Sequence, residues 1–137
     1  SWTSRTSGTS QTLWDVSYEG STFVAVGYSG TILHSSDGIS WSPKNSGTTK
    51  RLYGVTYGNN TFVAVGESGT LLTSEDGSSW TSRTTATTQY ILQATYGNGI
   101  FVVVGNSGKI LTSTDGISWT SRTSGTSSDL NGVTYKK

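Results

Sequence analysis

A period of 39 residues runs through the 137-residue chain without insertion or deletion, and it constrains the fold more than any other feature. Tryptophan marks the period at Trp2, Trp41, Trp80 and Trp119. A fixed period of about 20 to 50 residues is typical of repeat proteins, whose units bury their apolar faces against their neighbours. Because old natural repeats accumulate loop insertions, the unbroken period indicates a recently amplified repeat or an engineered one.

Each repeat is expected to contain four short antiparallel β-strands. Short polar segments typical of hairpin turns separate the strands. In the second repeat they are Gly-Asn-Asn, Glu-Ser-Gly and Glu-Asp-Gly. In the second repeat the strands are predicted at 52–58, 61–66, 70–74 and 79–84. The first strand alternates, so Leu52 and Val55 are expected on opposite faces. The second strand is apolar on both faces, which predicts that neighbouring sheets stack face to face.

The sequence therefore predicts an all-β fold, a β-propeller of 39-residue four-stranded antiparallel blades, with about 3.5 repeats per chain. A β-solenoid is the alternative, although solenoid coils are shorter and pair mainly between repeats. One repeat domain is expected over residues 1–137, with fourteen strands. Its predicted parts are the fourth strand of a partial blade (1–12), three blades (13–51, 52–90 and 91–129) and the first strand of another partial blade (130–137).

An open arc of three blades is expected to expose the apolar faces of its terminal blades, and such faces bind other surfaces. A second copy of the chain is the simplest partner. Two arcs that close head to tail would bury both faces in equivalent contacts. The sequence thus predicts a homodimer or a higher closed oligomer, in which the partial first and fourth strands could pair directly.

The turn between the third and fourth strands has the pattern Ser-x-Asp-Gly-x-Ser-Trp in all three full repeats. Its aspartates should accept backbone hydrogen bonds, its glycines should adopt positive φ, and its tryptophans should pack between blades. We therefore interpret the turn as structural and not as a metal or catalytic site. The residues concerned are Asp37, Gly38, Trp41, Asp76, Gly77, Trp80, Asp115, Gly116 and Trp119.

This turn resembles the Asp-box of the bacterial neuraminidase repeat, usually S-x-D-x-G-x-T-W, which occurs in sialidases, sortilin-like receptors and photosystem assembly factors. The present turn has one residue fewer between Asp and Gly and must be tighter. The resemblance implies a propeller in which the turn lies away from any active site and stabilises the fold.

Composition argues against several function classes. Nine basic and eight acidic residues leave no electrostatic footprint for nucleic acid or an anionic membrane, and no apolar run approaches membrane-spanning length. The chain has no cysteine and one histidine, His34, so we predict no metal site and no cofactor. The expected partners are a second copy of the chain or, as an alternative, carbohydrate, with no nucleic acid and no membrane.

We also predict that the chain is not an enzyme and has no catalytic residues. A glycosidase, suggested by the Asp-box analogy, needs two carboxylates on one face. The carboxylates outside the turns do not recur in register: Asp15, Glu19, Glu67, Glu75 and Asp129. A basic residue follows each of the four periodic tryptophans by three positions: Arg5, Lys44, Arg83 and Arg122. We expect these residues to protect the outer sheet edge from aggregation, with anion binding as the alternative.

Two functions of different classes remain. One is a non-catalytic, self-assembling propeller scaffold. The other is a propeller lectin that binds glycans through positions that vary between repeats, although relaxed surface drift also explains such variation. The candidate ligand-binding residues are Trp14, Asp15, Tyr28, Tyr53, Glu67, Gln93 and Asn106. A natural protein of this Ser/Thr-rich composition, with the sequon Asn59-Asn60-Thr61, would fit an extracellular or cell-surface location.

Overall fold

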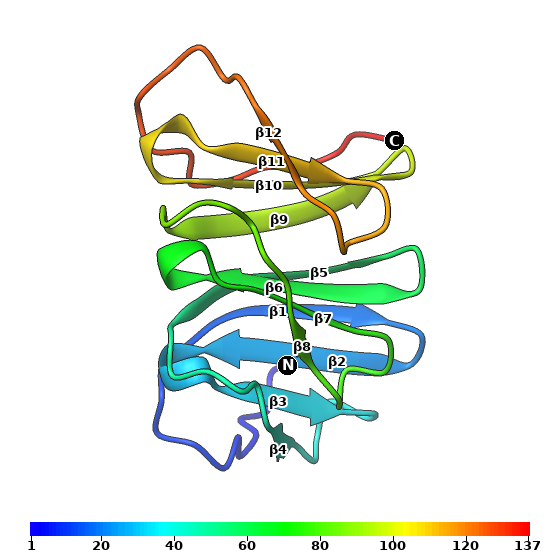
Figure 1. The fold of residues 1–137 in the computed structure, drawn as a ribbon. Coiled ribbons are helices and arrows are strands. Elements are labelled where there is room, and N and C mark those ends of the chain that lie inside the picture. The colour runs from blue at the N-terminus through cyan, green and yellow to red at the C-terminus, as the bar shows by residue number, and fades with distance from the viewer.

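The computed structural model describes residues 1–137 and consists mainly of short antiparallel strands (Figure 1). Twelve strands form three four-stranded sheets, each made from four consecutive strands, and this confirms the predicted all-β propeller architecture. Helical residues are confined to one short 3-10 turn per sheet, and no helix is long and apolar enough to cross a membrane.

Each sheet is one blade, with its strands ordered as they occur in the chain. The first blade contains β1 (Leu13–Glu19), β2 (Thr22–Gly27), β3 (Ile32–Ser35) and β4 (Ser42–Lys44). The second contains β5 (Leu52–Gly58), β6 (Thr61–Gly66), β7 (Leu71–Ser74) and β8 (Thr81–Ser82). The third contains β9 (Ile91–Gly97), β10 (Ile100–Gly105), β11 (Ile110–Ser113) and β12 (Thr120–Arg122). The 3-10 turns η1 (Tyr28–Gly30), η2 (Glu67–Gly69) and η3 (Asn106–Gly108) join the second and third strands.

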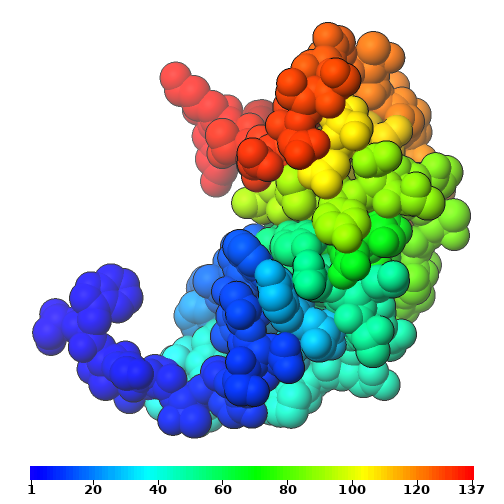
Figure 2. Space-filling view, turned by 90° about the vertical axis from the view of Figure 1, so that its left-hand side faces the viewer, coloured from blue at the N-terminus to red at the C-terminus, as the bar shows by residue number.

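The blades stack face to face with their first strands closest together. Strand β5 lies against β1 on one side and β9 on the other, whereas the fourth strands β4, β8 and β12 lie at the opposite edge of each sheet. Such convergence of the inner strands is typical of blades arranged around a propeller axis. In the side view of Figure 2, the two terminal segments lie at opposite ends of this stack.

The hydrophobic cores lie between the blades. At the first junction, Val24, Val26 and Ile32 of the first blade pack against apolar residues of the second, namely Leu52, Val55, Phe62, Ala64 and Leu72. The second junction repeats the arrangement with Val63, Val65, Leu71, Ile91, Ala94, Phe101, Val103 and Leu111. Both large clusters of buried apolar residues therefore depend on two blades packing together.

The first strand of each blade departs from simple alternation. In β5, Leu52 pairs with Gly66 while Gly54 pairs with Val65, so a β-bulge occurs between Leu52 and Gly54. Leu52 and Val55 both reach the core between the first and second blades. The expectation that these two residues lie on opposite faces is therefore wrong, because the extra residue of a bulge shifts the side-chain alternation by one position.

The terminal segments 1–12 and 130–137 form no strands, so the structure has twelve strands and not the expected fourteen. Residues 1–6 are exposed, including a fully exposed Trp2. Residues 130–135 follow the third blade, where the Leu130 N–H donates to the Gly105 carbonyl at 2.9 Å. A strand needs a hydrogen-bonded neighbour, and this chain supplies no adjoining strand to either segment.

Candidate functional site

The Ser-x-Asp-Gly turns are each held by one carboxylate oxygen. In the second blade, Asp76 Oδ1 accepts hydrogen bonds from the N–H groups of Ser78 and Ser79 at 2.8 and 2.9 Å. The same oxygen accepts the Ser74 hydroxyl at 3.0 Å. These contacts recur around Asp37 and Asp115, so one carboxylate closes each turn.

The glycine and the tryptophan of the turn connect it to the preceding blade. Gly77 has a φ of +75°, and a Cβ atom there would lie 2.9 Å from Val24 Cγ2 of the first blade. The Trp80 indole N–H donates to the Gly77 carbonyl at 3.1 Å, and its ring packs against the core between the first two blades. Trp119 packs in the same way at the second junction, whereas Trp41 lies beside a surface hollow of the first blade.

Backbone N–H donors lower the pKa of the turn aspartates below the ordinary value of 3.8. For Asp76 the largest cause is the Ser79 N–H, followed by that of Ser78, because both stabilise the ionised carboxylate. Because the pKa is lowered in the folded chain, these hydrogen bonds stabilise the fold at pH values above the ordinary pKa of 3.8. That contribution disappears as the pH falls through the lowered pKa values.

Replacement of Asp76 by alanine is therefore expected to lower the free energy of unfolding at neutral pH by about 1–2 kcal/mol, the usual effect of losing a capping side chain. In acid, below the lowered pKa, the variant and the original chain should have nearly the same stability. Urea unfolding at both pH values measures this. Glu75→Ala is the matched control, since Glu75 is exposed and makes no hydrogen bond within the chain. Equal losses for the two variants would contradict the structural role of Asp76.

Side chains of the first two blades form a continuous surface along the side of the stack where the first strands begin. We call it the aromatic surface, and it consists of Trp14, Tyr28, Arg51, Tyr53, Glu67 and Tyr90. The Trp14 ring lies 5.7 Å from the rings of both Tyr28 and Tyr53, measured between centroids. Tyr53 stacks on Tyr90 at 6.1 Å, and the Arg51 guanidinium carbon lies 4.7 Å from the centre of the Tyr28 ring.

Glu67 joins the polar groups of the aromatic surface. Its Oε1 accepts the Tyr90 hydroxyl at 3.3 Å and its Oε2 accepts the Arg51 N–H at 3.2 Å. The Arg51 N–H lowers the pKa of Glu67, while the negative charge of Glu67 raises the pKa of Tyr90. The third blade has Leu92, Asn106 and Asp129 at the corresponding positions, so the aromatic surface does not recur there.

The structure brings together four of the seven ligand-binding residues proposed from sequence: Trp14, Tyr28, Tyr53 and Glu67. The other three lie elsewhere. Asp15 Oδ2 accepts the Val55 N–H at 3.0 Å and so connects the inner strands of two blades. Gln93 accepts the N–H of its neighbour Ala94 at 3.0 Å, and Asn106 begins the turn η3 of the third blade.

Sequence reasoning missed two members of the aromatic surface, Arg51 and Tyr90. Both stand immediately before a first strand, and they occupy the same position of the 39-residue period. The remaining repeats have Thr12 and Asp129 there. Variation between repeats, the criterion that identified Tyr28 and Glu67, was therefore also present at this position.

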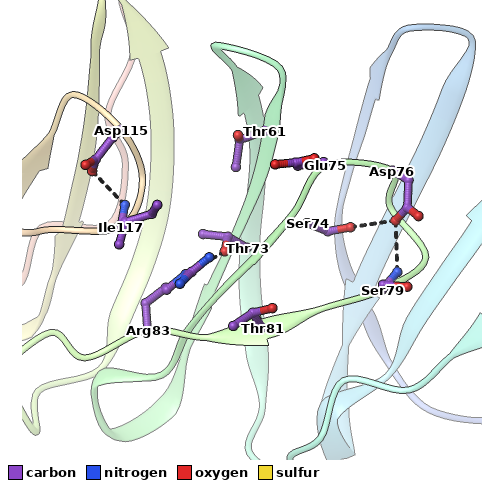
Figure 3. Close-up of a pocket in the computed structure, with 10 residues that line it drawn as sticks. All are labelled: Thr61, Thr73, Ser74, Glu75, Asp76, Ser79, Thr81, Arg83, Asp115 and Ile117. Atoms are coloured by element: carbon purple, nitrogen blue, oxygen red, sulfur yellow. Dashed lines mark hydrogen bonds between the residues drawn. The ribbon is translucent and has the colours of Figure 1, made fainter.

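A second hollow, which we call the interblade groove, lies between the outer strands of the second blade and the turn of the third (Figure 3). Its volume is about 280 Å³. The lining is polar except for one residue: Thr61, Thr73, Ser74, Glu75, Asp76, Ser79, Thr81, Arg83, Asp115 and Ile117. No three His, Asp or Glu side chains in the structure are grouped closely enough to hold a metal ion.

These features define a β-propeller segment in which the repeated turns join the blades and the surface between the first two blades is aromatic.

No protein-family profile and no curated protein matches the chain. It is similar to the solved structure of YCF48 bound to D1 peptide, with 25% identity over 82% of this chain and a TM-score of 0.71. YCF48 from Cyanidioschyzon merolae gives 23% identity over 81% and a TM-score of 0.68. The chain spans only 40% and 37% of the lengths of these two proteins.

Proposed function

We propose that this chain is a non-catalytic propeller scaffold that completes its fold by association with a second copy. The observation that supports the proposal is that the outer faces of the first and third blades, which no other blade of the chain covers, carry opposite halves of one kind of junction. The open face of the first blade carries Leu13, Val16, Tyr18, Phe23 and Trp41. One period later, the corresponding residues pack at the first junction: Leu52, Val55, Tyr57, Phe62 and Trp80.

The open face of the third blade supplies the other half of the junction. Val102, Val104 and Ile110 stand two periods after Val24, Val26 and Ile32, which the second blade covers at the first junction. A shallow hollow of about 400 Å³ lies on the open face of the first blade and is lined mainly by apolar residues. The two open faces are therefore complementary by the same packing that holds the internal blades together.

Docking of the first blade of one copy on the third blade of another requires both terminal segments to move, since Arg5 and Ser7 border the open face of the first blade. Residues 130–135 lie along the third blade, and the Tyr135 ring covers Gly97 as the Tyr96 ring covers Gly58. This single segment has no neighbouring strand, whereas β1 docks as part of a four-stranded sheet. The larger apolar face of the sheet favours displacement of the segment. Two chains then supply six complete blades in a closed ring.

The solution mass across a dilution series tests this proposal. We expect a discrete species with twice the 14.5 kDa mass of one chain, measured by light scattering or native mass spectrometry. Val16→Asp places a charge on the open face of the first blade and should yield a monomer. Thr88→Glu is the control, because Thr88 is exposed in the loop between the second and third blades. A chain that stays monomeric at every concentration would contradict the proposal.

A second candidate function is partner binding on the aromatic surface. Trp14 is 50% exposed, although it packs against the rings of Tyr28 and Tyr53. The Arg51 guanidinium packs on the Tyr28 ring, and the Glu67 carboxylate accepts the Arg51 backbone N–H and the Tyr90 hydroxyl, so a partner would meet mainly ring faces. Ring faces suit the apolar side chains of an extended peptide, and the similar protein YCF48 is bound to a D1 peptide. Carbohydrate, which also stacks on aromatic rings, is the other candidate for this surface.

A further inference from the structure

We propose that the interblade groove is a binding site for one unit of a neutral carbohydrate, which Arg83, Glu75 and Asp115 recognise. This inference goes beyond self-association and concerns a place whose lining shares no residue with the aromatic surface. The groove has a volume of about 280 Å³, near the lower end of small-molecule sites, and this suits a single sugar ring. In Figure 3, residues of β7 and β8 form one side, and Asp115 and Ile117 form the other.

Arg83 provides fixed hydrogen-bond donors in the groove. Its Nε donates to the Thr73 hydroxyl at 2.9 Å, and Thr73 itself is buried. Its backbone N–H donates to the Leu71 carbonyl at 2.8 Å, which holds the main chain in place. The Nη groups make no hydrogen bond within the chain. A guanidinium held through Nε therefore keeps its remaining donors for a ligand.

Glu75 and Asp115 provide acceptors that the protein does not use. No hydrogen bond within the chain involves the Glu75 carboxylate or Asp115 Oδ2. Asp115 Oδ1 is engaged in its own turn, where the Ser118 and Ile117 N–H groups lower the pKa of the carboxyl. The free oxygen therefore remains a charged acceptor in mildly acidic solution.

The mixture of donors and acceptors selects the class of ligand. Three carboxylates, those of Glu75, Asp76 and Asp115, line the groove beside one guanidinium, and they disfavour a phosphate or sulfate. Ile117 is the only apolar lining residue, so an apolar ligand would leave charged groups without partners. Sugar hydroxyls both donate and accept, and they can pair with the carboxylates and with Arg83 at the same time.

This set of side chains occurs once in the chain. Where the second blade has Glu75 and Arg83, the first blade has Ser36 and Lys44. The third blade keeps an arginine at the corresponding position but has Thr114 in place of the glutamate. No further blade of this chain covers the outer strands of the third blade. We therefore infer one carbohydrate site per chain, between the second and third blades.

The test is a titration of the full ¹⁵N-labelled chain with the methyl glycosides of glucose, galactose and mannose, each followed by amide NMR. At least one glycoside should shift the amides of Glu75, Asp76 and Ile117, with a dissociation constant in the millimolar range. Glu75→Thr, which introduces the third-blade residue, should raise that constant about tenfold, the effect of losing one charged hydrogen bond. Arg83→Gln should have a similar effect, and the exposed control Glu19→Gln should have none.

Several results would overturn the assignment. One is that none of the three glycosides shifts the groove amides, and another is that they do so equally in Glu75→Thr. A third is that the shifts occur at Trp14 and Tyr53, which would place carbohydrate on the aromatic surface. Thermal unfolding checks that Arg83→Gln remains folded. Glu75→Thr is the second variant, and it does not disturb the strand pairing because Glu75 is exposed and lies outside the strands. If the chain proves monomeric, the titration retains its meaning, because the groove lies within one chain.

Discussion

Aspartate in place of Val55 is expected to remove much of the stability of the chain, whereas aspartate in place of Val16 should leave it nearly unchanged. The two valines occupy the same position of the first strand, one 39-residue period apart. Val55 is 5% exposed in the core between the first and second blades, and Val16 is 56% exposed on the open face of the first. A buried carboxylate without a partner costs about 3–5 kcal/mol, a large part of the 5–15 kcal/mol that stabilises a typical domain.

Circular dichroism and urea unfolding of both variants measure this difference. Val16→Asp should retain the β-sheet signal and most of the free energy of unfolding, because its charge stays in water. The pair also connects stability with assembly, since Val16→Asp is the variant expected to prevent self-association. Two variants of equal stability would mean that the junction seen between the first two blades does not form the core in solution.

Alanine in place of Gly69 should be far more destabilising than alanine in place of Gly47. The two glycines have nearly the same φ, +74° and +75°. A Cβ atom at Gly69 would lie 1.9 Å from the Thr87 carbonyl oxygen, whereas nothing lies within 4 Å at Gly47. Gly47→Ala should therefore cost only about 1 kcal/mol for the positive φ. Gly69→Ala must also move the backbone at 87, and we expect it to cost about 3 kcal/mol or more.

Denaturant midpoints of these two variants give the comparison directly. Gly69 also accepts the Thr85 hydroxyl at 2.8 Å through its carbonyl, so displacement of this turn breaks a buried hydrogen bond. Because φ is matched, the difference between the variants isolates the close approach of the two chain segments. Equal losses of stability would show that the positive φ alone accounts for the glycine at both positions.

The sequence was sufficient to predict the propeller architecture, because a fixed period and hairpin turns determine strand order locally. The bulge between Leu52 and Gly54 was not predicted, because the sequence of this strand reads as a regular alternation, whereas the side chains in the folded strand do not follow it. The terminal strands were predicted because residues 1–6 have the same sequence as 118–123, which include β12, and residues 130–135 differ from the start of β5 at one position. They do not form, because strand pairing depends on a neighbour and not on the segment alone.

The candidate binding surfaces were predicted less completely than the fold. Variation between repeats identified Trp14, Tyr28, Tyr53 and Glu67, which the structure brings together. The same criterion also selected Asp15, whose carboxylate binds backbone N–H groups of two inner strands. The interblade groove was missed because the sequence assigns Arg83 to edge protection. Arg83 lines the groove together with the turn of the next blade because the repeats stack, and the sequence of a single repeat does not describe that stacking.

The position of the cores between blades has a consequence for how such a chain grows. Duplication of one 39-residue unit adds a blade and, with it, a complete new junction made from contacts that already exist elsewhere in the molecule. No compensating substitution is needed for the longer chain to pack. An insertion inside a unit has the opposite effect, because it shifts the strands that two adjacent cores share. A chain with this fold can therefore lengthen by duplication of whole units, and such growth keeps the repeat length constant.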